Sequence, residues 1–200
     1  MNLRALLFIF AAGSLSGQVS FDRILNANRE PQNWLTYSGS VMGQRHSPLT
    51  QITPANVKNL ELQWIWQARS LEKLEATALA IDGVLYTVQG PPAQGVYQVV
   101  ALDGVTGRPY WTTEYRPGPD AGPCCGRVSR GLAILGDTLY LGTIDAHIQA
   151  IDAKTGKLLW DKEAARAVDK YSITHAPLVL KDKIIVGVAG GDREIGRAHV

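Results

Sequence analysis

The stretch ALDGVTGRPYW at Ala101–Trp111 is repeated as AIDAKTGKLLW at Ala150–Trp160, an offset of 49 residues. Each copy predicts a strand, an Asp-x-x-Thr-Gly turn and a second strand that ends in Trp. The turn chemistry is suitable because Asp bonds its own backbone and Gly accepts positive φ. A repeat of this length is the size of a four-stranded blade, in which the Trp fills the space between neighbouring blades. The sequence therefore predicts an all-β fold, a β-propeller.

Other segments fit the same frame. Polar turns lie between apolar strand residues at 81–86, 135–140 and 180–185. The alternation at 60–66 predicts a half-buried strand, and Thr53 followed by Pro54 predicts the start of a short helix with Thr as its N-cap. These segments make only the first two to three blades, whereas closed propellers have four to eight. We therefore expect the N-terminal part of a longer propeller, with an open edge.

Composition narrows the function classes. The chain has 200 residues, 46% of them hydrophobic, with 20 Gly and 10 Pro, which favours a turn-rich all-β domain. Lys and Arg number 20 against 18 Asp and Glu, a formal net charge of +2, and the basic residues are scattered. This pattern excludes an electrostatic footprint for nucleic acid, so we expect no nucleic-acid partner.

The first 17 residues read as a secretory signal peptide. Arg4 supplies the positive charge, 5–15 is apolar, and 14–16 offers small residues for cleavage. The mature protein is then expected to be exported to the periplasm. The apolar stretch is short for a transmembrane helix, and no later segment approaches twenty apolar residues, so we expect no stable membrane span. A retained N-terminal anchor is the alternative.

The last residues, Glu194–Val200, read like the translation of a sequencing adapter. We expect 18–193 to be the N-terminal part of the propeller and 194–200 to be a non-native tail. A genuine polar tail is the alternative.

Cys124 and Cys125 are adjacent and are the only cysteines in the chain. In an exported protein they are expected to pair as a vicinal disulfide, a small strained ring. Such strain marks a functional site more often than a structural staple, because so small a ring constrains little of the unfolded chain. Two unpaired thiols in a Gly/Pro turn are the alternative.

With these features the chain resembles the quinoprotein alcohol dehydrogenases of the methanol and ethanol dehydrogenase type. These are periplasmic eight-bladed propellers that use pyrroloquinoline quinone and a divalent or trivalent metal ion. The likeness runs from about Trp34 to Asp192 in one order. The matching pieces are 33–39, 45–49, 52–60, the cysteine pair with Arg130 and Gly131, 174–177 and 187–192.

The resemblance implies roles for the residues around the cofactor. The Cys124–Cys125 ring would lie flat against one face of the quinone, and Glu75 would bond to the cofactor. Arg130 would meet a cofactor carboxylate or a quinone oxygen with its planar fork; Arg127 is nearer to the cysteines but off the family's spacing. For Glu75 the alternative is a solvated surface charge.

The same resemblance extends to two later segments. Thr174 would bond a cofactor carboxylate, and Ala189, Gly190 and Gly191 would let the backbone approach the cofactor edge. Asp192 stands where many members carry a metal-ligating Glu, and would bind Ca²⁺ or a lanthanide with a shorter stem. An ordinary strand Thr and an ordinary turn Asp are the alternatives. The remaining native histidines, His46, His147 and His175, show no metal spacing and receive no assignment.

The implied activity is oxidation of an alcohol by metal-assisted hydride transfer to the quinone, with electrons passed to a cytochrome c. In the family the catalytic base lies in later blades, so this chain alone is expected to be inactive. A non-catalytic scaffold propeller of the outer-membrane assembly type is the main alternative, and a carbohydrate-binding or regulatory propeller is another. The cysteine pair and Arg130 argue against a scaffold.

Overall fold

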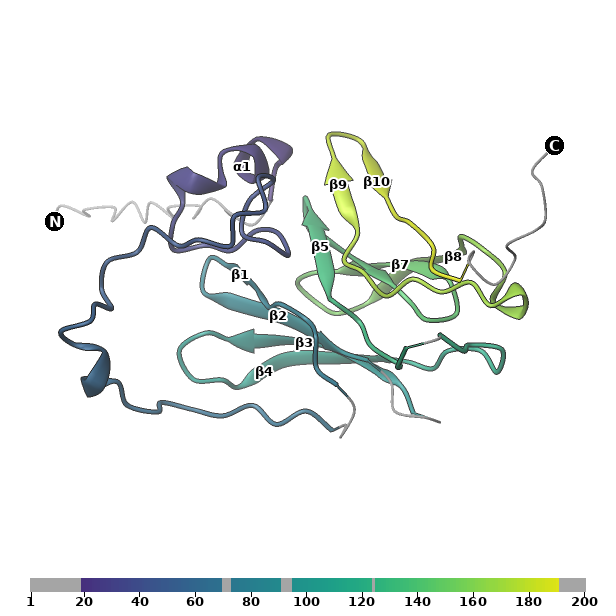
Figure 1. Cartoon of the computed structure of the whole chain (residues 1–200), viewed down its shortest axis with the longest axis horizontal. Coiled ribbons are helices and arrows are strands. Elements are labelled where there is room, and N and C mark those ends of the chain that lie inside the picture. Colours follow the sequence, from purple (N-terminus) through teal and green to yellow (C-terminus); the bar gives the residue numbers. More distant parts are fainter. Residues whose placement is uncertain (1–18, 70–72, 91–94, 124, 191–200) are drawn as a thin grey trace, which may run out of the picture.

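The computed structural model describes residues 19–69, 73–90, 95–123 and 125–190, which contain two four-stranded antiparallel sheets and a final hairpin (Figure 1). Blade one consists of β1 (Leu79–Ile81), β2 (Val84–Gln89), β3 (Tyr97–Asp103) and β4 (Pro109–Tyr115). Blade two consists of β5 (Leu132–Leu135), β6 (Thr138–Gly142), β7 (His147–Asp152) and β8 (Leu158–Glu163). The hairpin pairs β9 (Leu178–Leu180) with β10 (Lys183–Ile185). Each blade's strands lie in chain order, which confirms the predicted partial propeller.

The repeated turns have the predicted geometry. The Oδ1 atom of Asp103 accepts hydrogen bonds from the amides of Val105 and Thr106, and the following Gly107 has φ +68°. Asp152 repeats this arrangement in blade two, where Gly156 has φ +72°. A hydrogen bond from the Tyr110 hydroxyl lowers the pKa of Asp103 to about 2, so this carboxylate is ionised at neutral pH.

The blades are joined by the Trp side chains of the repeat, as predicted. Trp111 of β4 donates from Nε1 to the carbonyl oxygen of Ala153, 3.0 Å away in the turn of blade two. Its ring covers Gly156, where a Cβ would lie 2.5 Å from Trp111 Cε3. Trp64 docks in the same way on the blade-one turn and donates from Nε1 to Gly104 O at 3.3 Å. Each Trp therefore fills the gap above the next blade's turn.

Trp160 has no such turn to cover in the described part of the chain, and 38% of it is exposed. The buried side chains of both blades form one core, against which Trp111 packs. It includes Leu79, Val88, Tyr97, Val99, Leu132, Leu139, Leu141 and Ile151. The outer strands β4 and β8 of the two blades are both largely exposed.

A segment that the sequence analysis did not predict fastens the two blades together. This N-terminal clamp, residues 19–35, contains α1 (Phe21–Leu25) and the 3₁₀ turn η1 (Ala27–Arg29). Its first residue, Val19, exchanges two backbone hydrogen bonds with Gly136 of blade two, and Trp34 does the same with Ala80 of blade one. The N-terminal clamp therefore spans the hairpin turns of both blades.

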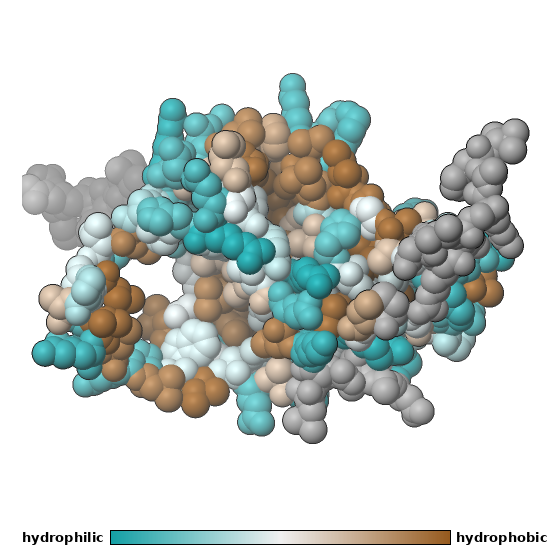
Figure 2. Space-filling model, in the orientation of Figure 1, coloured by the Kyte–Doolittle hydropathy of each residue, from teal (hydrophilic) through white to brown (hydrophobic). Residues whose placement is uncertain are grey.

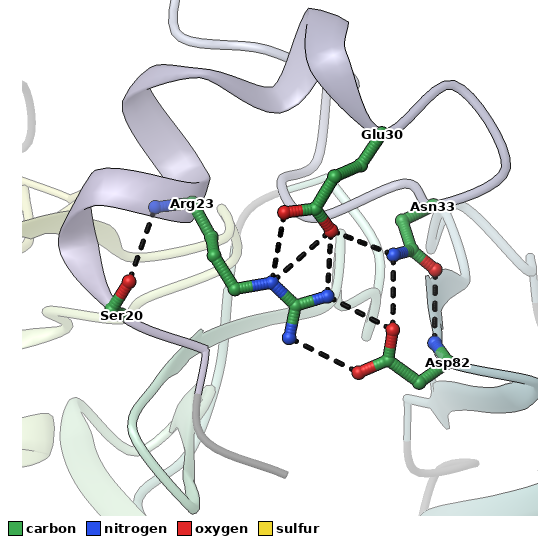
Figure 3. A network of polar contacts seen from close by, with 5 residues as sticks. All are labelled: Ser20, Arg23, Glu30, Asn33 and Asp82. Atoms are coloured by element: carbon green, nitrogen blue, oxygen red, sulfur yellow. Dashed lines mark hydrogen bonds and ion pairs between the residues drawn. The ribbon is translucent and has the colours of Figure 1, made fainter. Parts of the chain in front are cut away.

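An ion-pair network holds the N-terminal clamp on blade one (Figure 3). The Arg23 guanidinium binds Glu30 through Nη2 at 2.6 Å and Asp82 through Nη1 at 3.0 Å and Nη2 at 2.9 Å. Asn33 donates from Nδ2 to both carboxylates and accepts from the Asp82 amide. The hydrogen bonds from Arg23 lower the pKa of Glu30 and the pKa of Asp82 from their usual values.

Two local predictions are wrong. Residues 60–66 form no strand, because an alternating segment needs a partner for its backbone and none of the described strands pairs with it. Leu62 and Ile65 are consequently 76% and 74% exposed, while Trp64 faces the blade. The helix expected at Thr53 is a single turn that ends in the 3₁₀ helix η2 (Val57–Asn59). Here the Asn56 side chain accepts from the Thr53 amide, so Asn56 supplies the side-chain bond.

The segment from Thr53 to residue 66 arcs away from the sheets at the left of Figure 1. Figure 2 shows apolar atoms along this segment and an opening between it and the rest of the molecule. A second apolar area lies at the top of Figure 2, over the hairpin, where Leu178 and Ile185 are exposed. In the described ranges no helix is long and apolar enough to cross a membrane. The predicted signal peptide and tail lie outside those ranges.

Replacing Gly156 with Ala should destabilise the protein by about 2–4 kcal/mol, because a Cβ meets the Trp111 ring as well as a positive φ. Gly136 is the matched control: it has φ +63° and no atom within 4 Å of the added Cβ. Gly136→Ala should lower the unfolding free energy by only about 1 kcal/mol. Urea unfolding of both variants measures the difference, and equal losses would refute the Trp docking.

Replacing Arg23 with Met leaves two adjacent carboxylates unpaired and should lower the unfolding free energy by about 1–2 kcal/mol at pH 7. Both carboxylates have lowered pKa values in the folded protein, so their contribution is present above the unfolded pKa near ~4 and is lost as pH falls through the folded values. The difference from wild type should therefore shrink toward pH 3. Arg29→Met, at an exposed position of the same clamp, is the control; a pH-independent difference would contradict the network.

Candidate cofactor site

Three of the predicted site residues meet at the starts of successive blades. Glu75 precedes β1, Arg130 precedes β5 and Thr174 precedes β9. The first strands of neighbouring blades lie close together, so the residues just before them converge. Arg130 Nη2 lies 2.8 Å from Glu75 Oε2, and Arg130 Nη1 donates to Thr174 Oγ1 at 3.3 Å. The Arg130 amide also donates to the Thr174 carbonyl oxygen at 2.9 Å. One residue thus connects blade one, blade two and the hairpin.

These three side chains line one side of a hollow of about 470 Å³, including space open to solvent. Cys125 and Val128 add apolar surface beside Arg130, and Ala189 and Gly190 form another wall. The hollow therefore combines an apolar floor with a guanidinium, a hydroxyl and bare backbone, a composition common to sites for small ligands.

The backbone wall is built by a close approach between two segments. Ser172 and Ala189 exchange two backbone hydrogen bonds, at 3.0 Å and 2.8 Å. The following Gly190 has φ +105°, and a Cβ there would overlap the carbonyl oxygen of Lys170. Only glycine suits this position, so the wall presents backbone without a side chain, as the prediction for Gly190 requires.

Glycines also let the blade starts pack closely. A Cβ on Gly90, just after β2, would overlap the carbonyl oxygen of Arg127. A Cβ on Gly142, at the end of β6, would overlap the side chain of Ile173. The segments that carry Arg130 and Thr174 are therefore seated directly on the preceding blade.

A buried carboxylate anchors the loop that leads to the cysteines. Asp145, 4% exposed, accepts hydrogen bonds from the Tyr115 hydroxyl at 2.7 Å, the Gly118 amide at 2.8 Å and the Thr143 hydroxyl. Burial, followed by the hydrogen bond to Asp145, raises the pKa of Tyr115. The turn of blade two thus holds the end of β4 and the start of the cysteine loop. Sequence reasoning missed this residue, since no local pattern marks it.

The remaining predicted residues have different outcomes. Cys124, Gly191 and Asp192 lie outside the described residues. Among the described residues no cysteine is free, and no group of His, Cys, Asp and Glu could hold a metal ion. Arg127 turns to the Ala121 carbonyl oxygen, 3.3 Å from its Nη1, and does not line the hollow. The structure therefore brings together Glu75, Cys125, Arg130, Thr174, Ala189 and Gly190, while what they bind stays a prediction.

The donor set fits a planar cofactor that carries carboxylates. The guanidinium has five N–H donors and the Thr174 hydroxyl is a neutral donor, which suits carboxylate and quinone oxygens. The bare Gly190 wall allows a flat ring system to approach the backbone. Glu75 supplies the opposite charge that orients Arg130.

A partial propeller with a hollow that is charged on one rim and made of glycine backbone on another has the composition of a ligand-binding propeller. The sequence profile of the pyrroloquinoline quinone family, described as "Glucose/ethanol/alcohol dehydrogenase, beta-propeller domain", matches residues 34–198. The chain belongs to this family.

Several characterised proteins are similar to the chain. It is 36% identical over 184 residues to the quinoprotein alcohol dehydrogenase PedH of Pseudomonas putida, which covers 90% of this chain and 30% of PedH. It is also 36% identical over 187 residues to the lanthanide-dependent methanol dehydrogenase of Methylacidiphilum fumariolicum, with the same coverage. Among solved structures, a europium-containing methanol dehydrogenase superposes with a TM-score of 0.79 at 33% identity, covering 85% of this chain and 30% of that one. The chain thus spans about 30% of the length of these relatives.

Replacing Asp145 with Ala should loosen the cysteine loop, because the Tyr115 hydroxyl and the Gly118 amide both donate to Asp145 Oδ2 and would lose their acceptor. We expect a loss of about 1–3 kcal/mol in unfolding free energy and faster proteolysis within 116–123. Asp120→Ala, at an exposed position of the same loop, is the control. Limited proteolysis followed by mass spectrometry measures the effect; unchanged cleavage in the Asp145 variant would show that this carboxylate does not anchor the loop.

Proposed function

We propose that this chain supplies part of the pyrroloquinoline quinone site of an alcohol dehydrogenase. The observation that carries the proposal is the contact of Arg130 with both Glu75 and Thr174 at the rim of the hollow. The similarity to quinoprotein alcohol dehydrogenases supports the same assignment. When bound, the quinone and its metal ion supply a hydride acceptor for the alcohol carbon.

The residues of this chain bind and orient the cofactor. Arg130 holds a carboxylate or quinone oxygen with its fork, and Glu75 fixes the guanidinium from the other side while accepting a hydrogen bond from the cofactor. Thr174 donates its hydroxyl to a carboxylate. The backbone at Ala189 and Gly190 borders the ring edge and excludes water from it.

The cysteine pair and the residues after the glycine wall complete this part of the site. In this proposal Cys124 and Cys125 form a vicinal disulfide that packs flat against one face of the cofactor. Gly191 continues the backbone wall, and Asp192 binds the metal ion, either Ca²⁺ or a lanthanide, through its carboxylate.

The same proposal places the rest of the reaction outside this chain. The catalytic base belongs to later blades, so the 200 residues alone are inactive. Electrons leave the complete protein for a cytochrome c. Residues 1–17 direct the protein to the periplasm, where the disulfide forms.

The test is a cofactor titration of the protein expressed from its complete gene, with pyrroloquinoline quinone and either Ca²⁺ or La³⁺, followed by dye reduction with a panel of alcohols. Arg130→Lys keeps the positive charge but removes the planar guanidinium with its two parallel N–H donors. This variant should bind the cofactor about 10–100-fold more weakly, equivalent to about 1.4–2.8 kcal/mol. Glu75→Gln should weaken it as well, because the amide no longer fixes the guanidinium.

Arg127→Lys is the matched control, since Arg127 is close in sequence but does not line the hollow. The affinity of the Arg127→Lys variant for the cofactor should match that of wild type. A wild-type protein that binds no quinone and oxidises no alcohol would move the assignment to a scaffold propeller.

A further inference from the structure

Both ring nitrogens of His175 contact backbone groups close in sequence to residues that line the hollow. Nδ1 lies 2.8 Å from the carbonyl oxygen of Ala176. Nε2 lies 2.8 Å from the amide nitrogen of Gly187 and 2.9 Å from the carbonyl oxygen of the same residue. No role for this histidine is predicted from the sequence, because it shows no metal spacing.

The imidazole joins two segments that border the hollow. His175 directly follows Thr174, and Gly187 lies between the end of β10 and the wall residues Ala189 and Gly190. Strand pairing stops at Ile185, and after it the single bridge between Ser172 and Ala189 is the only ladder contact of the described wall. Without His175 the backbone at 186–188 would lose its lateral support.

Hydrogen-bond satisfaction selects one tautomer. A proton on Nδ1 is donated to the Ala176 carbonyl, and the free lone pair on Nε2 accepts from the Gly187 amide. The opposite tautomer would donate from Nε2 to the Gly187 carbonyl oxygen, but it would leave the Ala176 carbonyl facing a lone pair and the Gly187 amide facing an N–H, so it satisfies one contact instead of two. With these contacts the ring works as a rigid spacer of fixed length between the two segments.

The His175 ring lies close to the backbone of Gly187. A Cβ on Gly187 would lie 3.6 Å from His175 Nε2, in ordinary van der Waals contact. His175 is half-buried and Gly187 is exposed, so the contacts at Nε2 are open to solvent.

We propose that His175 is a positioning residue of the cofactor site. By holding Gly187, it places Ala189 and Gly190 at the correct distance from Thr174 and Arg130. This inference rests on the proposed function, because the wall matters for catalysis only if the cofactor binds there. His175 itself does not line the hollow, so it acts through the wall and not by contact.

Three substitutions separate the two bonds of the ring. In His175→Gln the side-chain amide reaches the place of Nε2 and can accept from the Gly187 amide; in His175→Asn it reaches only the place of Nδ1 and keeps the Ala176 contact. His175→Ala removes both. The control is His147→Asn on β7, another half-buried histidine, which pairs with Asp161 away from the hollow.

Two measurements are made on the complete protein: hydrogen exchange of the peptide that covers 186–190 without cofactor, and the Kd for pyrroloquinoline quinone from tryptophan fluorescence. His175→Asn and His175→Ala should exchange about tenfold faster in this peptide and bind the quinone about tenfold more weakly. His175→Gln and His147→Asn should stay within about threefold of wild type.

The outcomes separate the two claims. If wild type binds the quinone but the Asn and Gln variants behave alike in exchange and affinity, the positioning role of His175 is overturned and the proposed function stands. If wild type binds no quinone, the proposed function fails, and faster exchange in the Asn and Ala variants but not in the Gln variant would still support the contact with Gly187. Equal exchange in all variants overturns the inference whatever the cofactor does.

Discussion

The contact of Arg130 with Glu75 and Thr174 is the constraint on which the site depends. The two ionised side chains are 40% and 32% exposed, so solvent screens their attraction and their pairing adds little stability. Its consequence is geometric, because one planar guanidinium can meet both partners only if the starts of two blades and the hairpin lie at fixed distances. The arrangement of these side chains at the hollow therefore depends on how the blades are packed.

Blade packing is set far from the hollow by two devices. Trp64, in the segment 60–66 that forms no strand, and Trp111 on β4 each cover a glycine turn of the following blade and hydrogen-bond to its backbone. At the turns between the first two strands of each blade, the N-terminal clamp bonds to Gly136 in blade two and, through Arg23, to Asp82 in blade one. Contacts at both ends of the sheets leave little freedom for one blade to rotate against the other, and that rigidity holds Arg130 against Glu75.

The repeat made the blades and their turns predictable, because each Asp-x-x-Thr-Gly turn is closed by local bonds such as those of Asp103. Convergence of Glu75, Arg130 and Thr174 could be expected only from the family resemblance, since the residues belong to different blades. The Arg23 network and His175 were not predictable, because their partners are 59 and 12 residues away and no spacing rule links them. Residues 60–66 show the opposite error: the alternation is present, but a strand also needs a partner.

The most direct measurement is a structure of the complete protein with pyrroloquinoline quinone and Ca²⁺ bound. The account predicts the quinone between Cys125 and the Gly190 wall, with a carboxylate or quinone oxygen within hydrogen-bond distance of Arg130 and another oxygen near Thr174. Quinone density at any other place, or a hollow between Arg130 and Gly190 filled by side chains of a later blade, would contradict it.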